Sequence, residues 1–263
     1  MDPVRAIADA VLYEGYALWP YTRSALKNQR RWTWGGVFPP AHTALHPDDP
    51  CEMRAQVRCD DPTAVAVTVR FLHVVARAAG DEYEAWDEAT EREVGPGEFA
   101  IAAGSSGLRS WRALAGRVRT AVDGDRLTVT VRNDTPFAGD REAALRQTLC
   151  STHMVLRGAA FVTATEASGC ESIGCWPVLI DDETMLCSPI ILEDHPRIAP
   201  ESPGDLFDGG EIDGLLALNI LALTDAEKAE MRASDPRTRE ILERTEALTE
   251  AQLMRLSGYR LQQ

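Results

Sequence analysis

Three cysteines in the second half of the chain carry the most reactive side chains of the sequence. Cys170 and Cys175 fall within the stretch SGCESIGC, and Cys187 follows shortly after it. Thiolates and imidazoles are the ligands that zinc and the iron of iron–sulfur clusters prefer, and His153 lies upstream of the cysteines. Cys170, Cys175, Cys187 and His153 are therefore a candidate site for zinc or iron.

The spacing of these cysteines favours a simpler interpretation. Zinc knuckles use cysteine pairs with two intervening residues, whereas the gap from Cys170 to Cys175 is longer and no second pair mirrors it. We expect reduced, half-buried thiols and no cofactor, because cysteine also packs as a small hydrophobic residue. A metal- or redox-active module is kept as an alternative.

Catalytic motifs are missing from the sequence. It contains no phosphate-cradling glycine loop and neither the GxSxG nor the HExxH pattern. A second alternative is a cysteine- and histidine-dependent enzyme, which would need His153 or His195 beside a cysteine to act as its base. We assign no catalytic residue and expect a binding protein.

Two stretches of opposite charge are the other feature that predicts function. Residues 21–34, YTRSALKNQRRWTW, hold four basic side chains and no acid, whereas residues 192–213 hold seven acids against one arginine. Aromatic or apolar side chains lie among the charges in both stretches, which is typical of interaction segments. The candidate partner-binding residues are Arg23, Lys27, Arg30, Arg31, Trp32, Trp34, Asp205, Leu206, Phe207, Asp208 and Glu211.

These two stretches allow several interpretations. They pair with each other inside the fold, or both face outward and dock onto a partner. The acidic stretch alone is also explained as a solvated surface loop. Its carboxylates at Asp205, Asp208 and Glu211 could bind calcium, although the ligand pattern of an EF-hand loop is absent.

Composition disfavours several classes of function. The 263 residues are 44% hydrophobic and 26% charged, which is typical of a globular protein. The formal net charge of −14 disfavours nucleic acids and anionic membranes, because both are bound through cationic side chains. No apolar run is long enough to cross a membrane, and the N-terminus lacks the pattern of a signal peptide. We expect a cytoplasmic protein that does not insert into membranes.

The elements ahead of the cysteines are predicted to be mostly strands. Asp2 followed by Pro3 predicts a helix start, since an N-cap acid and a first-turn proline favour one. Apolar and polar side chains alternate at 63–77 and at 117–133, which predicts strands. The Asp123-Gly124 pair favours a tight hairpin in the second range, because glycine tolerates the positive φ of such turns.

Further strands are expected around the cysteines. A short helix is predicted at 140–150 and a strand at 151–164. CWPVLI and MLCSPIIL flank the acidic turn DDET, which predicts a second hairpin. The run LLALNILAL, residues 215–223, is short and continuously apolar, and it predicts a buried strand.

Helix-start patterns replace strand patterns from Thr224 onward. Thr224 and Glu227 have capping-box spacing, as do Thr249 and Gln252, and Ser234-Asp235-Pro236 restarts a helix.

These patterns together predict an α+β protein. Its antiparallel β core is expected to be sandwich-like. The predicted domains are a β-rich core with an N-terminal helix at 1–223 and a helical C-terminal appendage at 224–263.

Long blocks of the sequence also resemble a known family. These blocks are ADAVLYEGYALWPYTRSALKNQRRWTWGGVFPP, STHMVLRG, CWPVLIDD, MLCSPIILEDHPRIAPESPGDLFDGGEID and LTDAEKAEMRASDPRTREILERTEALT. They are similar to a family of uncharacterised bacterial proteins whose genes commonly accompany those of NiFe uptake hydrogenases and their maturation factors. The resemblance covers nearly the whole chain and supplies no catalytic residues, and the cysteines of GCESIGC depart from the family pattern. It implies an accessory or assembly role through binding to a hydrogenase subunit or a maturation factor.

Overall fold

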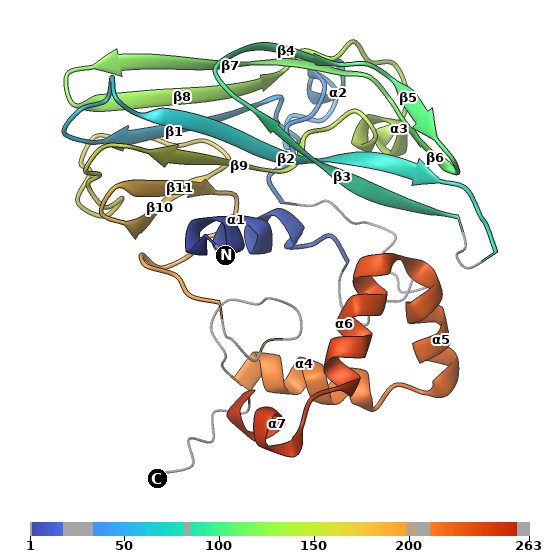
Figure 1. Ribbon diagram of the computed structural model, residues 1–263. Coiled ribbons are helices and arrows are strands. Elements are labelled where there is room, and N and C mark those ends of the chain that lie inside the picture. The colour runs from blue at the N-terminus through green and yellow to red at the C-terminus, as the bar shows by residue number, and fades with distance from the viewer. Residues whose placement is uncertain (1, 18–33, 82–84, 199–201, 203–210, 257–263) are drawn as a thin grey trace. The chain divides into compact units, whose positions relative to one another are not determined.

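The chain forms an α+β fold with two compact units, seen here in a computed structural model (Figure 1). The described residues are 2–17, 34–81, 85–198, 202 and 211–256. The first unit comprises Met1–Glu14, Trp32–Arg77 and Asp87–His195. The second comprises Gly15–Arg31, Ala78–Trp86 and Pro196–Gln263.

One sheet of the first unit is antiparallel and has the strand order β1-β8-β7-β4. The strands are β1 (Glu52–Arg58), β8 (Arg126–Asn133), β7 (Leu114–Asp123) and β4 (Gly97–Ile101). Asp123 pairs with Arg126 across the turn, and Gly124 adopts a φ of 60°. The hairpin predicted at Asp123-Gly124 is confirmed, because this backbone conformation suits glycine.

The second sheet has the order β10-β11-β9-β2-β6-β5, and β3 also pairs with β2. Its strands are β10 (Trp176–Asp181), β11 (Thr184–Ser188), β9 (Cys150–Arg157), β2 (Ala66–Arg77), β6 (Arg109–Trp111), β5 (Gly104–Ser106) and β3 (Trp86–Val94). The strand predicted at 63–77 and the hairpin around DDET are both confirmed. The strand predicted at 151–164 is confirmed only in its first half, since β9 ends at Arg157.

A shared apolar core lies between the two sheets and makes the first unit a sandwich. Alternate residues of each strand point into it, because successive side chains of a strand face opposite sides. From the first sheet come Met53, Ala55, Val57, Leu127, Val129 and Val131; from the second come Val69, Phe71, Met154, Leu156, Met185 and Cys187.

Helix α1 (Pro3–Tyr13) lies against β9, β11 and β2 of the second sheet. The helix start predicted at Asp2 and Pro3 is confirmed, since the Asp2 carboxylate accepts a hydrogen bond from the Val4 amide at 3.0 Å. Two shorter helices, α2 (Pro40–Thr43) and α3 (Arg141–Leu145), occur in connections of the same unit.

The second unit contains α4 (Glu211–Leu221), α5 (Asp225–Ser234), α6 (Pro236–Glu246) and α7 (Glu250–Leu256). The capping box predicted at Thr224 and Glu227 is confirmed, and Asp235 caps α6 through the amides of Arg237 and Thr238. Buried Ile220, Met231, Ile241 and Leu242 form its apolar cluster.

The strand predicted at 215–223 is wrong, because most of this run belongs to α4. Ala217 and Ile220 are buried, and their three-residue spacing is that of one helix face. The domain boundary predicted at 223–224 separates α4 from the later helices, whereas contacts place α4 in the second unit with them.

Candidate functional site

Cys170 and Cys175 line the same small pocket, which has a volume of about 120 Å³. The pocket lies between β1, the connection after β9 and the start of β10, and Trp176 is 40% exposed beside it. Apart from these residues, it is lined by Gln56, Val57, Val162, Ala164, Ala167, Ser172 and Pro177.

Hydrogen bonds to β1 hold the cysteine-bearing loop in place. The amide of Ile173 donates to the Arg54 carbonyl at 2.7 Å, and the Arg54 amide donates to the Ile173 carbonyl at 2.9 Å. The Glu171 amide donates to the side-chain oxygen of Gln56 at 2.9 Å. The loop therefore covers backbone groups of an edge strand that would otherwise be open to pairing with another chain.

Burial keeps two of the three cysteines in the thiol form. It raises the pKa of Cys175 to about 12, and the Cys175 thiol donates to the Arg54 carbonyl at 3.4 Å. Burial also raises the pKa of Cys187, which is fully buried. Cys170 and Cys175 are both half-buried. Because the thiolate is the nucleophile and the metal-binding form, the protonated Cys175 and Cys187 are poorly suited to either role.

His153 does not join the cysteines. It pairs with Arg70 in the β2–β9 ladder, and its Nδ1 donates to the Ser151 carbonyl at 3.2 Å. The next residue, Met154, faces the core and pairs with Cys187, so His153 points to the opposite side of the sheet. Burial and the nearby Arg70 charge lower the pKa of His153 to about 3, which makes it neutral at ordinary pH.

The four candidate metal ligands are therefore only partly brought together. Cys170 and Cys175 share a pocket, and Cys187 lies within electrostatic range of Cys175. Within the described part of the chain, no three or more His, Cys, Asp or Glu side chains are arranged to hold a metal ion.

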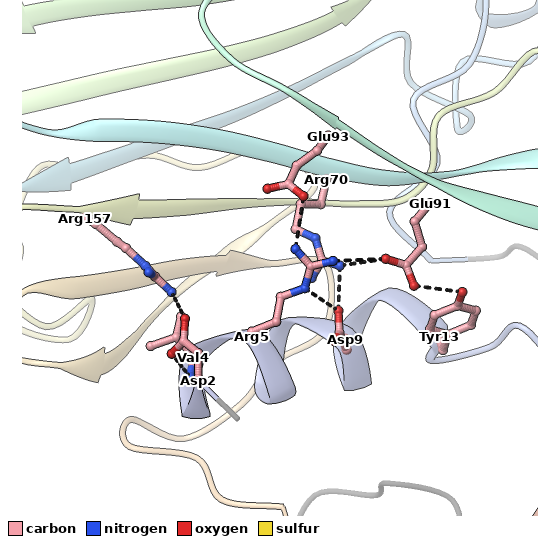
Figure 2. Close-up of polar contacts among 9 residues, drawn as sticks. All are labelled: Asp2, Val4, Arg5, Asp9, Tyr13, Arg70, Glu91, Glu93 and Arg157. Carbon is pink, nitrogen blue, oxygen red and sulfur yellow. Dashed lines mark hydrogen bonds and ion pairs between the residues drawn. The ribbon is translucent and has the colours of Figure 1, made fainter.

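A cluster of ion pairs that the sequence analysis did not predict lies between α1 and the second sheet (Figure 2). Arg70 of β2 is 3% exposed and binds Asp9 of α1 at 2.6 Å and Glu91 of β3 at 3.1 Å. Arg5 binds the same two carboxylates, each at 3.2 Å. The signal in the sequence is an arginine in the middle of the apolar strand VRFLHVV, since a buried charge needs partners.

The cluster holds both ends of α1 on the sheet. At the helix start, Arg157 binds Asp2 at 2.8 Å, and this contact lowers the pKa of the Asp2 carboxyl. At the helix end, the Tyr13 hydroxyl donates to Glu91 at 3.0 Å. Figure 2 shows these contacts along the length of α1, so the cluster fixes this helix on the second sheet.

Most of the predicted partner-binding residues lie outside the described residues. These are Arg23, Lys27, Arg30, Arg31, Trp32, Asp205, Leu206, Phe207 and Asp208. Trp34, at the end of the basic stretch, is described and is 38% exposed. Glu211 begins α4.

Helix α4 exposes leucines directly after the acidic stretch. Leu215 is 59% exposed and Leu218 is 50% exposed, whereas Ala217 and Ile220 are buried. Leu215 and Leu218 are three residues apart, so they share one face of α4 and present apolar surface to solvent there.

Neither family models nor curated proteins gave a match to this chain. Among the helices that the structure describes, none has both the length and the apolar character needed to cross a membrane.

Proposed function

We propose that this protein is an accessory or assembly protein of a NiFe uptake hydrogenase and that it acts by binding another protein. The partner is a hydrogenase subunit or a maturation factor, and the complex forms in the cytoplasm without nucleic acid. The resemblance of long blocks over nearly the whole chain supports this role.

One observation carries the proposal: each charged stretch adjoins large exposed apolar side chains. Trp34 ends the basic stretch and is 38% exposed. Leu215 and Leu218 follow the acidic stretch and are 59% and 50% exposed. Interfaces combine apolar anchors with a charged rim, so the face around α4 fits a partner surface that is apolar with basic residues around it.

The protonation states of buried groups also support binding over catalysis. Burial keeps the Cys175 thiol protonated, with a pKa of about 12, and keeps His153 neutral, with a pKa of about 3. A nucleophile and a base are effective when their pKa values lie near the working pH, which neither value does.

The test is capture of purified hydrogenase subunits and maturation factors by the full-length chain. The Leu215→Asp and Leu218→Asp double variant is expected to weaken capture at least tenfold, because it places charge in the apolar anchor. Charge reversal at Arg30 and Arg31 is expected to weaken capture as well.

The matched control is Leu45→Asp, since Leu45 is 77% exposed in the first unit and lies in neither charged stretch. It should leave capture unchanged. Thermal unfolding of each variant checks that the fold is retained. Capture that survives both the leucine and the arginine changes in folded protein would refute the binding role.

A second candidate function is thiol redox chemistry, which the shared pocket of Cys170 and Cys175 favours. The half-buried Cys170 would attack a peroxide, breaking its O–O bond, forming a sulfenic acid and releasing water or an alcohol. The Cys175 sulfur would then displace the sulfenic hydroxyl as water, and the disulfide formed would account for the two electrons passed to the peroxide.

A further inference from the structure

We infer that a second pocket of the first unit binds a small organic carboxylate. This pocket lies beside β5 and β6 and has a volume of about 370 Å³, within the range of small-molecule sites. Its walls include Val74, Ala76, Ala103, Trp111, Arg112 and Arg146. Cationic and apolar groups thus line the same space.

Arg112 supplies the charge for an anion. Within the described residues it forms no ion pair, and it is an exposed residue that lines the pocket. A guanidinium matches a carboxylate through two parallel hydrogen bonds, so Arg112 is suited to hold one.

The second arginine explains why a single negative charge fits best. Arg146 already lies 3.4 Å from Asp87 and 3.5 Å from Glu142. Its charge is therefore neutralised by these acids, which leaves the single guanidinium of Arg112 as the pocket's cation without an ion pair among the described residues. A carboxylate matches that balance, whereas a phosphate group with nearly two negative charges does not.

The apolar wall indicates that the carboxylate is carried on an apolar body. The Trp111 indole nitrogen donates to the Ala102 carbonyl at 3.0 Å, which fixes the ring. A Cβ added to Gly104 would lie 2.7 Å from the Trp111 ring, so any side chain at this position would clash with the ring. Ala76 and Ala103 have short side chains, which keep the space beside the ring open.

The test is a titration of the full-length protein with benzoate, followed by NMR and calorimetry. The indole N–H signal that disappears from the NMR spectrum of Trp111→Phe is assigned to Trp111. In the wild type this signal should shift when benzoate binds. Benzamide, which has the same shape without the charge, should bind at least tenfold more weakly. Arg112→Gln should weaken benzoate binding about tenfold, because a charge-assisted pair of hydrogen bonds is lost.

Arg119→Gln is the matched control, since Arg119 is exposed on β7 of the other sheet and the variant removes the same charge. It should bind benzoate as the wild type does. The inference is overturned if benzoate leaves the Trp111 signal unmoved, if Arg112→Gln and Arg119→Gln behave alike, or if inorganic phosphate binds more tightly than benzoate. Because Arg112 is exposed, its replacement should leave the melting temperature unchanged.

Discussion

The guanidinium of Arg70 lies 2.6 Å from the carboxylate of Asp9, although 61 positions separate the two residues in the chain. Arg70 is 3% exposed on its side chain, whereas Asp9 is 39% exposed. The pair joins helix α1 to strand β2, and Glu91 of β3 completes the charge balance at 3.1 Å (Figure 2). A buried arginine is tolerated here because two carboxylates face it.

Asp9→Asn is expected to lower the free energy of unfolding by about 1–3 kcal/mol, because it removes a charge-assisted hydrogen bond to a buried arginine. Arg5→Gln in the same cluster should cost less than about 1 kcal/mol, since the Arg5 side chain is 43% exposed. Urea denaturation of both variants measures the difference. A larger loss for Arg5→Gln would contradict the role given to Arg70.

Glu14→Gln is expected to stabilise the protein at pH 7. Burial raises the pKa of Glu14 in the folded state, so the folded state holds this proton more tightly than the unfolded state. The protein therefore loses stability as the pH rises through the pKa that Glu14 has in the unfolded chain. The loss is complete above the pKa that Glu14 has in the folded state. Denaturation curves should therefore show the gain of the variant at pH 7 and its disappearance near pH 3. Glu171→Gln, at an exposed site, should show no gain.

His153 is expected to make the fold sensitive to acid. Its folded pKa of about 3 lies below the ordinary value of 6.5, so only the unfolded state takes up a proton between these values. Stability is therefore complete above pH 6.5 and falls as pH drops toward 3. In this window His153→Gln should reduce the slope of unfolding free energy against pH by up to about 1.4 kcal/mol per pH unit.

The exposed His46 provides the control for that measurement, and His46→Gln should leave the slope unchanged. Part of the slope should survive in the His153 variant, because burial and Arg92 also lower the pKa of His73, to about 4. An unchanged slope in His153→Gln would show that His153 is protonated in the folded state.

Stoichiometric peroxide is expected to link Cys170 to Cys175. All six cysteines are free, so titration of free thiols should fall from six to four, with a mass loss of about 2 Da. Cys170→Ser should block the link, whereas Cys51→Ser should not, although Cys51 is also half-buried. Peptide mapping that finds a sulfinic acid at Cys170 without a disulfide would refute the redox pair.

The parts of the fold that were predicted correctly depend on neighbouring residues. The Asp123-Gly124 hairpin, the Asp2 cap of α1 and the Thr224–Glu227 capping box each form among residues two or three positions apart. Such contacts are available in any environment, so the sequence pattern alone indicates them.

The apolar run 215–223 shows where that reasoning fails. A short run of apolar residues has no period that distinguishes a buried strand from a helix. Packing decided the case, since Ile220 of α4 joins Met231 and Leu242 of the neighbouring helices in one cluster. The exposure of Leu215 and Leu218 results from the same helical conformation, and the hydrophobicity of the run does not predict it.

The amino-acid sequence by itself established an acidic α+β chain, its hairpins and caps, and the reactive cysteines. The tertiary structure placed Cys170 and Cys175 in one pocket, turned His153 away from them, and brought Arg70 to Asp9. The physical reason is how far apart in the sequence the interacting residues lie. Turns and caps are stabilised by contacts within a few residues, whereas the surroundings of a buried side chain depend on the order in which distant strands pair.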